Sequence, residues 1–307
     1  MENPRKSSAG SKQPKIGLIG VGTMGRMILS RLIETGHDVI VFEIAEEANF
    51  YAKSQGAEIV HTPQEIPSEV TLILLCLPGP METEAVMLGD DGLITHLGSD
   101  HIIIDLSTSD PAMTRYLAEE VEGAGGSLLD APILGRPASI GHWILPVGGD
   151  KASLEHCLPT LETFASQAIW VGPSGAGHTL KLLNQLMFST INGITAEVLA
   201  ICTKSGLSPN ILFETIASSG AATVSGLFRE TGRKIVDRDF EPVFTIDLLC
   251  KDASLGLKMA KDFGAPPMIA EVVQTYNEIA KATGLGNEDT SALVKVFESL
   301  YEPALNS

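Results

Sequence analysis

The stretch Ile16–Gly25 reads IGLIGVGTMG and joins a short apolar run to three spaced glycines. The run Ile16–Ile19 is typical of a buried parallel strand. Apolar residues then recur at helical spacing from Met24 to Ile33, and Gly36 provides a C-terminal stop. The stretch therefore predicts the strand–turn–helix unit that opens a Rossmann-type sheet.

The turn between this strand and this helix is predicted to hold a dinucleotide. It comprises Gly20, Val21, Gly22, Thr23, Met24 and Gly25, in the pattern G-x-G-x-x-G. In this pattern the first glycine makes a tight turn, the second lets a pyrophosphate approach the backbone, and the third allows close helix–strand packing. The alternative, an ordinary flexible turn, does not account for the strand before it and the helix after it.

Glu43 follows the second predicted strand, Val39–Phe42. An acidic residue at this place can bind both ribose hydroxyls of NAD, and it would repel the 2′-phosphate of NADP. The next residues are Ile44 and Ala45, so no arginine stands there to accept a phosphate. Glu43 could instead only favour the start of the following helix. The sequence predicts NAD as the cofactor.

Strand and helix patterns alternate from Lys15 to about Val171, which predicts an α/β domain with a doubly wound parallel sheet over residues 15–174. Further strands are expected at Leu72–Leu77, Ile102–Ile104, Leu128–Leu129, Ile144–Val147 and Ala168–Val171, and helices at Ala45–Gln55, from Pro111, and from Asp150 to about Phe164. From 175 to 307 every pattern is helical, with one long helix over Thr179–Lys204 and breaks near Gly206, Gly220, Pro242 and Pro266, which predicts an all-α C-terminal domain. The polar residues 1–14 are expected to form a disordered leader.

Composition narrows the possible partners. The 307 residues include 38 acidic and 21 basic side chains, a formal net charge of −17, which argues against nucleic acid and anionic membrane surfaces. The longest apolar runs are far shorter than the roughly 20 residues that span a bilayer. Four cysteines without a C-x-x-C pair indicate buried thiols in a reducing compartment, so we expect the cytoplasm. The histidines show no metal-ligand spacing, and we expect no metal.

Lys181 is the candidate catalytic residue. It follows the glycine-rich segment Gly172–Gly177, near the start of the long predicted helix. The partial positive charge of a helix N-terminus and burial among leucines both favour a neutral amine, which can act as a general acid and base. The alternative is a solvated surface lysine. Asn184 and Gln185 lie about one turn further on, where either amide could orient a substrate oxygen.

A second candidate region follows the predicted strand Leu128–Leu129. The stretch Asp130–Leu145 reads DAPILGRPASIGHWIL. Within it, Gly135 and Arg136 could present a backbone amide and a guanidinium to an anion. The alternative is a surface loop with a solvent-facing arginine.

Taken together, these residues resemble the β-hydroxyacid dehydrogenase family, over nearly the whole chain from Lys15 to about Leu300. The first glycine-rich stretch is similar to the family's first signature, and Gly172–Asn184 is similar to its catalytic segment, which implies that Lys181 is the catalytic lysine. The resemblance also implies several lining residues: Leu77, Pro78 and Thr108 for the cofactor, Ser107 for the substrate, and Lys251, which would close over the nicotinamide.

The resemblance implies an NAD-dependent enzyme that transfers hydride between nicotinamide and a small 3-hydroxyacid or its semialdehyde. The substrate would lie in the crevice between the domains, held by Ser107, Gly135, Arg136 and Asn184. One departure concerns substrate choice, because the family's usual Ser-Gly-Gly is replaced here by Leu134-Gly135-Arg136. A similar Gly-Arg pair occurs in sulfolactaldehyde reductases.

A reductase for a sulfonated aldehyde therefore stays as an alternative. An imine reductase of the same architecture and a non-catalytic cofactor-binding module are further alternatives, and the presence of Lys181 argues against both. The partner we expect is a small anionic substrate. The long helix, together with the resemblance, favours a homodimer or homotetramer.

Overall fold

The computed structural model describes residues 13–218 and 226–301. The leader predicted over residues 1–14 lies outside this part of the chain except for its last two residues, and so does the break predicted at Gly220. Contacts divide the chain into two compact units, the first ending at Lys181 and the second beginning at Leu182.

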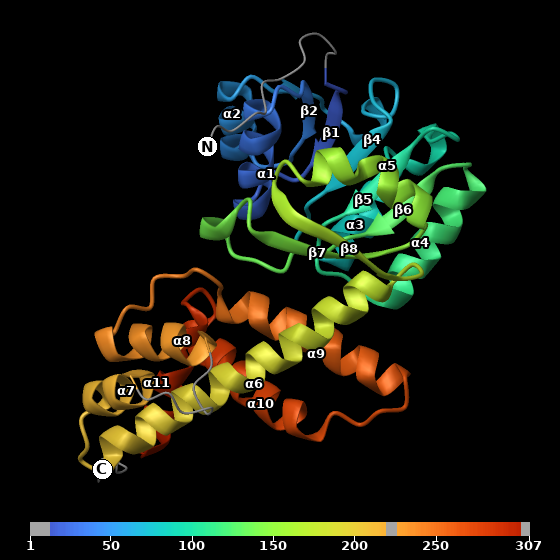
Figure 1. Ribbon diagram of the computed structural model, residues 1–307. Coiled ribbons are helices and arrows are strands. Elements are labelled where there is room, and N and C mark those ends of the chain that lie inside the picture. The colour runs from blue at the N-terminus through green and yellow to red at the C-terminus, as the bar shows by residue number, and fades with distance from the viewer. Residues whose placement is uncertain (1–12, 219–225, 302–307) are drawn as a thin grey trace, which may run out of the picture. The chain divides into compact units, whose positions relative to one another are not determined.

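The first unit is built on a sheet of eight strands in the order β3-β2-β1-β4-β5-β6-β7-β8 (Figure 1). The strands are β1 (Ile16–Ile19), β2 (Val39–Phe42), β3 (Glu58–Ile59), β4 (Leu72–Leu75), β5 (Ile102–Asp105), β6 (Ser127–Asp130), β7 (Trp143–Gly148) and β8 (Ala165–Gly172). The first six strands are mutually parallel. The expectation of a wholly parallel sheet is wrong at one pairing, because β7 runs antiparallel to β6. No α-helical crossover separates these two strands, only a loop with a single turn of 3₁₀-helix, η3 (Pro137–Ser139), and such a connection reverses the chain direction.

Helices cover both faces of this sheet, as the doubly wound prediction requires. They are α1 (Thr23–Glu34), α2 (Glu46–Ser54), α3 (Pro80–Leu88), α4 (Pro111–Gly123) and α5 (Lys151–Leu161), with short 3₁₀ turns η1 (Pro63–Glu65) and η2 (Ile94–His96). Alternate residues of β4 enter two separate cores. Leu74 joins the core built with α1, α2 and α5, while Ile73 joins the core built with α3 and α4. The period-2 geometry of a strand thus serves two helix layers at once.

The described part of the second unit is helical, as predicted. It comprises α7 (Pro209–Ser218), α8 (Gly226–Asp237), α9 (Ile246–Asp262), α10 (Met268–Ala280), a π turn η4 (Lys281–Leu285), a 3₁₀ turn η5 (Thr290–Leu293) and α11 (Val294–Tyr301), together with most of α6 (Ala176–Lys204). Glycines let α6 approach its neighbours closely. A Cβ at Gly193 of α6 would lie 2.9 Å from Val273 of α10, and one at Gly256 of α9 would lie 2.9 Å from Leu186.

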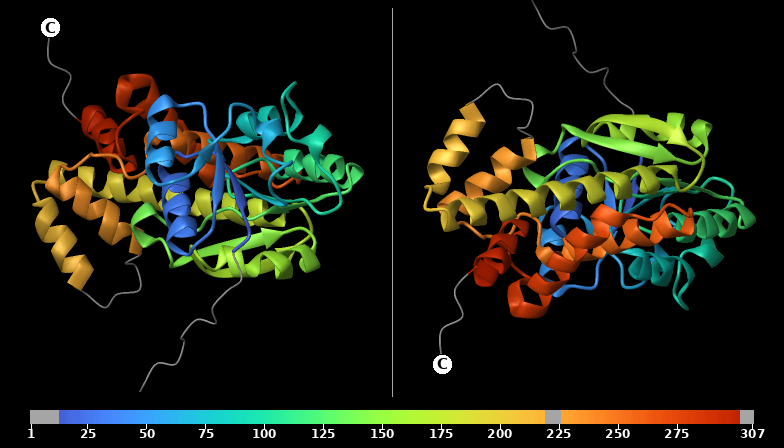
Figure 2. Two further views of the ribbon diagram at one scale, coloured as in Figure 1. Left: turned by 90° about the horizontal axis from the view of Figure 1, so that it is seen from above. Right: turned by 90° about the horizontal axis from the view of Figure 1, so that it is seen from below.

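The 29-residue α6 has the length and apolar composition of a helix that could cross a membrane. The central helix of a globular unit meets the same criteria. Figures 1 and 2 show α6 alongside α9 and α10. Buried polar side chains of its later turns bond to other elements of the unit: the Asn192 amide donates to the Thr290 carbonyl at 2.8 Å, and Ser189 Oγ accepts from Asn277 at 2.8 Å. These contacts are typical of a core helix.

Candidate active site

The glycine-rich turn after β1 has the shape that a pyrophosphate requires. Gly20 has φ +93°, and a Cβ there would lie 2.3 Å from the Cys76 carbonyl oxygen. A Cβ at Gly25 would lie 2.2 Å from the carbonyl oxygen of Gly20. Gly22 differs, because a Cβ there would meet no atom within 4 Å. The first and third glycines are thus required by the chain itself, while the second leaves open space beside the backbone.

The start of α1 offers donors to that open space. Gly22 is the N-cap residue of α1, and no side chain caps this helix end. The first-turn N–H groups, which include those of Thr23 and Met24, have no partner within an α-helix, and they favour an anion. Val21 contributes differently, because its side chain is fully buried in the core below the turn. The turn therefore fits the phosphates of a dinucleotide.

Glu43 at the end of β2 lies beside this turn. Its Oε2 accepts a hydrogen bond from Val21 N at 2.6 Å, and its Oε1 accepts from Ile44 N and Ala45 N at 2.8 Å each. Both interpretations of Glu43 therefore have a structural counterpart, since it contacts the glycine-rich turn and also the backbone at the start of α2. Its contact with a ribose stays a prediction.

The loops after β4 and β5 meet at the same edge of the sheet. Leu77 N donates to Ser107 Oγ at 2.9 Å, and Ser107 N donates to Asp105 Oδ1 at 2.9 Å. Pro78 and Thr108 follow directly in these two loops. Because β1, β4 and β5 are parallel neighbours, their carboxyl ends bring these loops next to the glycine-rich turn, as a ligand-binding edge requires. The structure thus brings the four predicted residues of these loops together.

Lys181 lies at the last position of the first unit, in the second turn of α6. Its Nζ donates to the Ile133 carbonyl oxygen at 2.9 Å. Gly177 lets the helix start rest on the sheet, because a Cβ there would lie 2.4 Å from the Asp130 carbonyl oxygen and 2.5 Å from that of Pro146. The amine of Lys181 is therefore held at the loop that follows β6.

A buried polar cluster below Lys181 was missed by the sequence analysis. Asp130 accepts from Gly175 N and from His178 N, each at 2.8 Å, and His178 is fully buried. Burial raises the pKa of the Asp130 carboxyl group, and the nearby His178 counteracts this effect. Asp105 lies beside Asp130 in the sheet. The available signal was an aspartate at the end of two successive apolar strands.

The loop that contains Gly135 and Arg136 is held by Trp143. A Cβ at Gly135 would lie 2.1 Å from Trp143 Cδ1, and the Trp143 Nε1–H donates to the Arg136 carbonyl oxygen at 2.8 Å. Ser139 Oγ donates to the same oxygen at 2.9 Å. Packing against the indole explains the glycine, which its sequence context had suggested as an anion-binding residue. The side chain of Arg136 is half-buried, and substrate contacts of both residues stay predictions.

The predicted site residues of the second unit surround Asp252. The buried amide of Gln185 donates to Asp252 Oδ2 at 2.6 Å and accepts from Asn184 Nδ2 at 3.3 Å. Lys251 Nζ lies 2.8 Å from Asp252 Oδ1. Both ends of the Gln185 amide thus bond to protein groups, which favours a positioning role over the predicted substrate contact. Asp252 directly follows Lys251 in the sequence, but no sequence pattern indicates its role.

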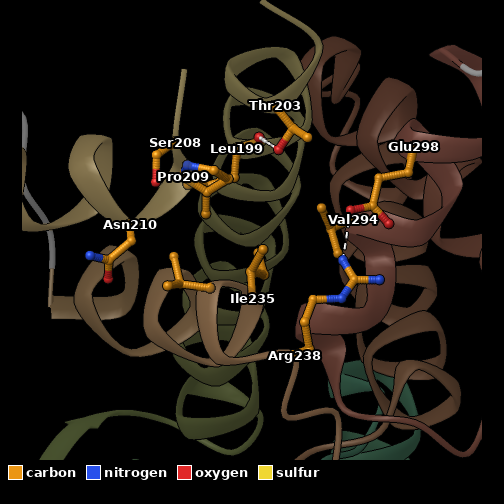
Figure 3. A pocket seen from close by; sticks show the side chains of 10 residues that line it. Leu199, Thr203, Ser208, Pro209, Asn210, Ile235, Arg238, Val294 and Glu298 are labelled. Carbon is orange, nitrogen blue, oxygen red and sulfur yellow. Dashed lines mark hydrogen bonds and ion pairs between the residues drawn. The ribbon is translucent and has the colours of Figure 1, made fainter. Parts of the chain in front are cut away.

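A cavity of about 370 Å³ in the second unit holds none of these residues (Figure 3). It is lined by residues of α6, α7, α8 and α11, together with Ser208 and Arg238. Arg238 Nη1 pairs with Glu298 Oε1 there at 2.6 Å. The described residues also contain no group of three or more His, Cys, Asp or Glu side chains placed to hold a metal ion. The sheet edge of the first unit and the Asp252 cluster are therefore the candidate site regions.

Known proteins resemble both halves of the chain. The family profile of the NAD-binding domain of 6-phosphogluconate dehydrogenase matches residues 15–172. The profile described as the NAD-binding region of NADP-dependent 3-hydroxyisobutyrate dehydrogenase matches residues 175–297. The first description names NAD and the second names both NAD and NADP, so together they indicate a nicotinamide cofactor.

Individual relatives extend over almost the full length. The 2-(hydroxymethyl)glutarate dehydrogenase of Eubacterium barkeri is 31% identical, over 94% of this chain and 96% of its own. The 3-sulfolactaldehyde reductase of Escherichia coli is 30% identical, over 91% and 94%. Among solved structures, the 3-hydroxyisobutyrate dehydrogenase of Mycobacterium tuberculosis with L-serine superimposes with a TM-score of 0.82 at 25% identity, over 92% and 98%. With a Rossmann-type first unit, a helical second unit and these relatives, the chain belongs to the β-hydroxyacid dehydrogenase family and is a nicotinamide-dependent oxidoreductase of the hydroxyacid dehydrogenase and semialdehyde reductase type.

Proposed function

We propose that this enzyme transfers hydride between NAD and a small 3-hydroxyacid or its semialdehyde, with Lys181 as the general acid and base. One observation carries the proposal. Lys181 Nζ donates to the Ile133 carbonyl oxygen at 2.9 Å, which holds the amine at the sheet edge that also carries the glycine-rich turn. A lysine amine at this edge can take a proton from a substrate hydroxyl and return it.

Each group of the candidate site has its own proposed role. The nicotinamide supplies the chemistry of hydride acceptance and donation. The first-turn amides of α1 bind phosphate beside Gly22, and Glu43 binds ribose hydroxyls. Lys181 removes the proton of the substrate hydroxyl during oxidation and returns it during reduction, a contribution of about 10²–10⁴ in rate. Ser107, Asn184 and Arg136 orient the substrate, and Lys251, beside Asp252, contacts the cofactor.

The preference for NAD over NADP is assigned to Glu43. Its carboxylate is already bonded to Val21 N, and a 2′-phosphate would meet this negative charge. Lost ribose hydrogen bonds and repulsion together amount to about 2–4 kcal/mol, or roughly 30- to 1000-fold in kcat/KM. Kinetics with NAD⁺ and NADP⁺ measure this ratio, and Glu43→Gln is expected to reduce it. Equal efficiency of the wild type with both cofactors would contradict the role of Glu43.

We assign recognition of the substrate's acid group to Arg136. A guanidinium matches the two oxygens of a carboxylate and also suits a sulfonate. Both acid groups occur among the substrates named for the relatives, 2-(hydroxymethyl)glutarate and 3-sulfolactaldehyde. The presence of Arg136 keeps the sulfonated aldehyde as the second candidate substrate.

A substrate panel tests the proposed reaction. It comprises 3-hydroxyisobutyrate and 2-(hydroxymethyl)glutarate with NAD⁺, and tartronate semialdehyde, sulfolactaldehyde and a cyclic imine with NADH. We expect turnover with at least one acid or acid aldehyde, measured as a change in absorbance at the NADH band. Turnover of the imine alone would instead indicate an imine reductase. Cofactor binding without any turnover would indicate a non-catalytic module.

We further propose a homodimer or homotetramer in the cytoplasm that binds neither nucleic acid nor membranes. Exposed apolar residues recur along one side of α6 at Leu183, Met187, Ile194, Val198 and Ile201, which supports a contact between copies. Burial raises the pKa of the Cys76 and Cys157 thiols to about 12, which favours the protonated thiol near neutral pH. Light scattering after size-exclusion chromatography tests the assembly, and a monomer at micromolar concentration would contradict it.

A further inference from the structure

His178 is a fully buried imidazole in the first turn of α6, and the proposed reaction does not use it. It lies between two carboxylates at the ends of adjacent strands. Its Nε2 is 3.9 Å from Asp105 Oδ2, and its Nδ1 is 4.0 Å from Asp130 Oδ2. Burying three ionisable groups together is costly unless each is bonded, so the partners of each group indicate which segments the cluster holds together.

Both ring nitrogens of His178 have defined partners. Nε2 lies 3.1 Å from the Ser107 carbonyl oxygen and must donate to it, because a carbonyl only accepts. Nδ1 lies 2.7 Å from Thr114 Oγ1, which in turn lies 3.1 Å from the Asp110 carbonyl oxygen. The ring thus connects α6 to α4 and to the loop after β5.

The backbone of the same residue connects α6 to β6. Asp130 accepts from His178 N and Gly175 N, two groups at the helix start that have no partner within the helix. Lys181 follows His178 by three residues, which is just under one helical turn. Its Nζ returns to Ile133, three residues after Asp130. The first turn of α6, which contains His178, therefore fixes the position at which the Lys181 side chain begins and the direction in which it extends.

We propose that His178 is a positioning residue of this active site. It holds the general acid and base Lys181 and the substrate-binding Ser107 in a fixed geometry relative to each other. The inference rests on the proposed function of Lys181. His178 itself touches neither substrate nor cofactor in this role. A displacement of about 1 Å at a catalytic group can cost about 10²-fold in rate, so loss of the ring should reduce turnover far more than cofactor binding.

Two substitutions distinguish the contribution of the Nε2 hydrogen bond of His178 from that of its Nδ1 hydrogen bond. In His178→Gln, the side-chain amide can reach the place of Nε2 and donate to Ser107, whereas His178→Leu removes both bonds while keeping bulk. We expect His178→Leu to lower kcat by about 10- to 100-fold, with the Kd for NADH unchanged within threefold. We expect His178→Gln to recover at least a third of the wild-type kcat. Measurements use the best substrate of the panel at a temperature well below each variant's Tm.

His37 offers a matched control. It is also a buried histidine of the first unit, with Nδ1 at 2.9 Å from the Pro14 carbonyl oxygen, and it lies before β2, at the opposite end of the strands from the site. We expect His37→Leu to lower Tm but to leave kcat within twofold of wild type. A fall in kcat that is equal in both leucine variants would overturn the positioning role, as would an unchanged kcat in His178→Leu.

Thr114→Val keeps the test decisive if His178→Leu does not fold. The substitution removes only the hydroxyl that contacts Nδ1, and we expect kcat to fall by about 3- to 10-fold at unchanged NADH affinity. An unchanged kcat would count against the positioning role. Lys181→Met distinguishes the two levels of inference. If that variant keeps turnover, the proposed function fails, whereas an inactive Lys181→Met together with a fully active His178→Leu refutes the positioning role alone.

Discussion

Two loops follow parallel strands of the same sheet, and each contains glycine for a different reason. The turn after β1 keeps open space beside Gly22, where a Cβ would meet no atom within 4 Å. The loop after β6 has no such space at Gly135, because a Cβ there would lie 2.1 Å from Trp143. The first loop is shaped for a ligand that approaches the backbone. The second is shaped by its own packing and can offer a ligand mainly its side chains and the neighbouring Lys181.

This difference shows that cofactor binding and substrate conversion depend on different kinds of sequence feature. Phosphate binding needs only backbone N–H groups and a helix start, which a stretch of six residues provides. Substrate binding and proton transfer need groups from distant segments, since Ile133 and Lys181 meet across 48 residues of sequence. Variants in either loop should therefore affect different kinetic parameters.

The largest expected effect concerns Lys181. We predict that Lys181→Met lowers kcat by about 10²–10⁴, because the proton of the substrate hydroxyl loses its acceptor. NADH affinity should stay within a few-fold, since the glycine-rich turn is untouched. Steady-state kinetics and a fluorescence titration with NADH check both statements. Retention of more than about a tenth of wild-type kcat would remove Lys181 from the acid–base role.

The glycines of the first loop separate ligand binding from packing. We predict that Gly22→Ala raises the Kd for NADH by about tenfold, roughly 1.4 kcal/mol, with Tm unchanged within about 2 °C. Gly25→Ala should instead lower stability by about 1–3 kcal/mol, because the new Cβ would overlap the Gly20 carbonyl oxygen. Calorimetry and NADH titration separate the two. A loss of stability in Gly22→Ala without loss of affinity would show that the open space is not a ligand site.

Arg136 provides the corresponding test in the second loop. Loss of a charge-assisted hydrogen bond of about 1.5–3 kcal/mol predicts that Arg136→Ala raises KM for the acid substrate by roughly 10- to 150-fold. The fall in kcat should be smaller, because the acid group does not react and is bound alike in ground and transition states. Arg136→Lys keeps the charge without the planar fork and should be intermediate. An unchanged KM in the alanine variant would place the guanidinium away from the substrate.

The smallest effect lies outside both loops. Asp150 caps α5, and its Oδ2 accepts from Ser153 N at 2.7 Å. This hydrogen bond holds the pKa of the Asp150 carboxyl group below its ordinary value. Because the pKa is lower in the folded protein than in the unfolded chain, the ionised Asp150 stabilises the fold at pH values above the ordinary pKa. This stabilisation is lost as the pH falls through the lowered pKa. We predict that Asp150→Ala costs about 0.5–2 kcal/mol at pH 7 and less near pH 3, by urea unfolding, with kinetics unchanged.

Much of the fold follows from local patterns. The strands Ile16–Ile19 and Val39–Phe42 have the bounds that their apolar runs predict, and the long helix ends at Lys204 as predicted. Among the strands and α-helices of the first unit, the sequence patterns do not predict β3 and α3. The two-residue β3 exists only through its pairing with β2, and the apolar residues of α3 form no periodic stripe from which a helix could be recognised.

The sequence by itself determined the chemistry of single residues, namely a glycine turn, an acid after a strand and a lysine after a glycine run, because each depends on its immediate neighbours along the chain. Only the tertiary structure decided their surroundings. It placed Trp143 against Gly135, Ile133 at Lys181, and His178 between Asp105 and Asp130. The contacts of Lys181 and His178 join segments that are far apart in sequence, and folding alone brings such segments within hydrogen-bond distance.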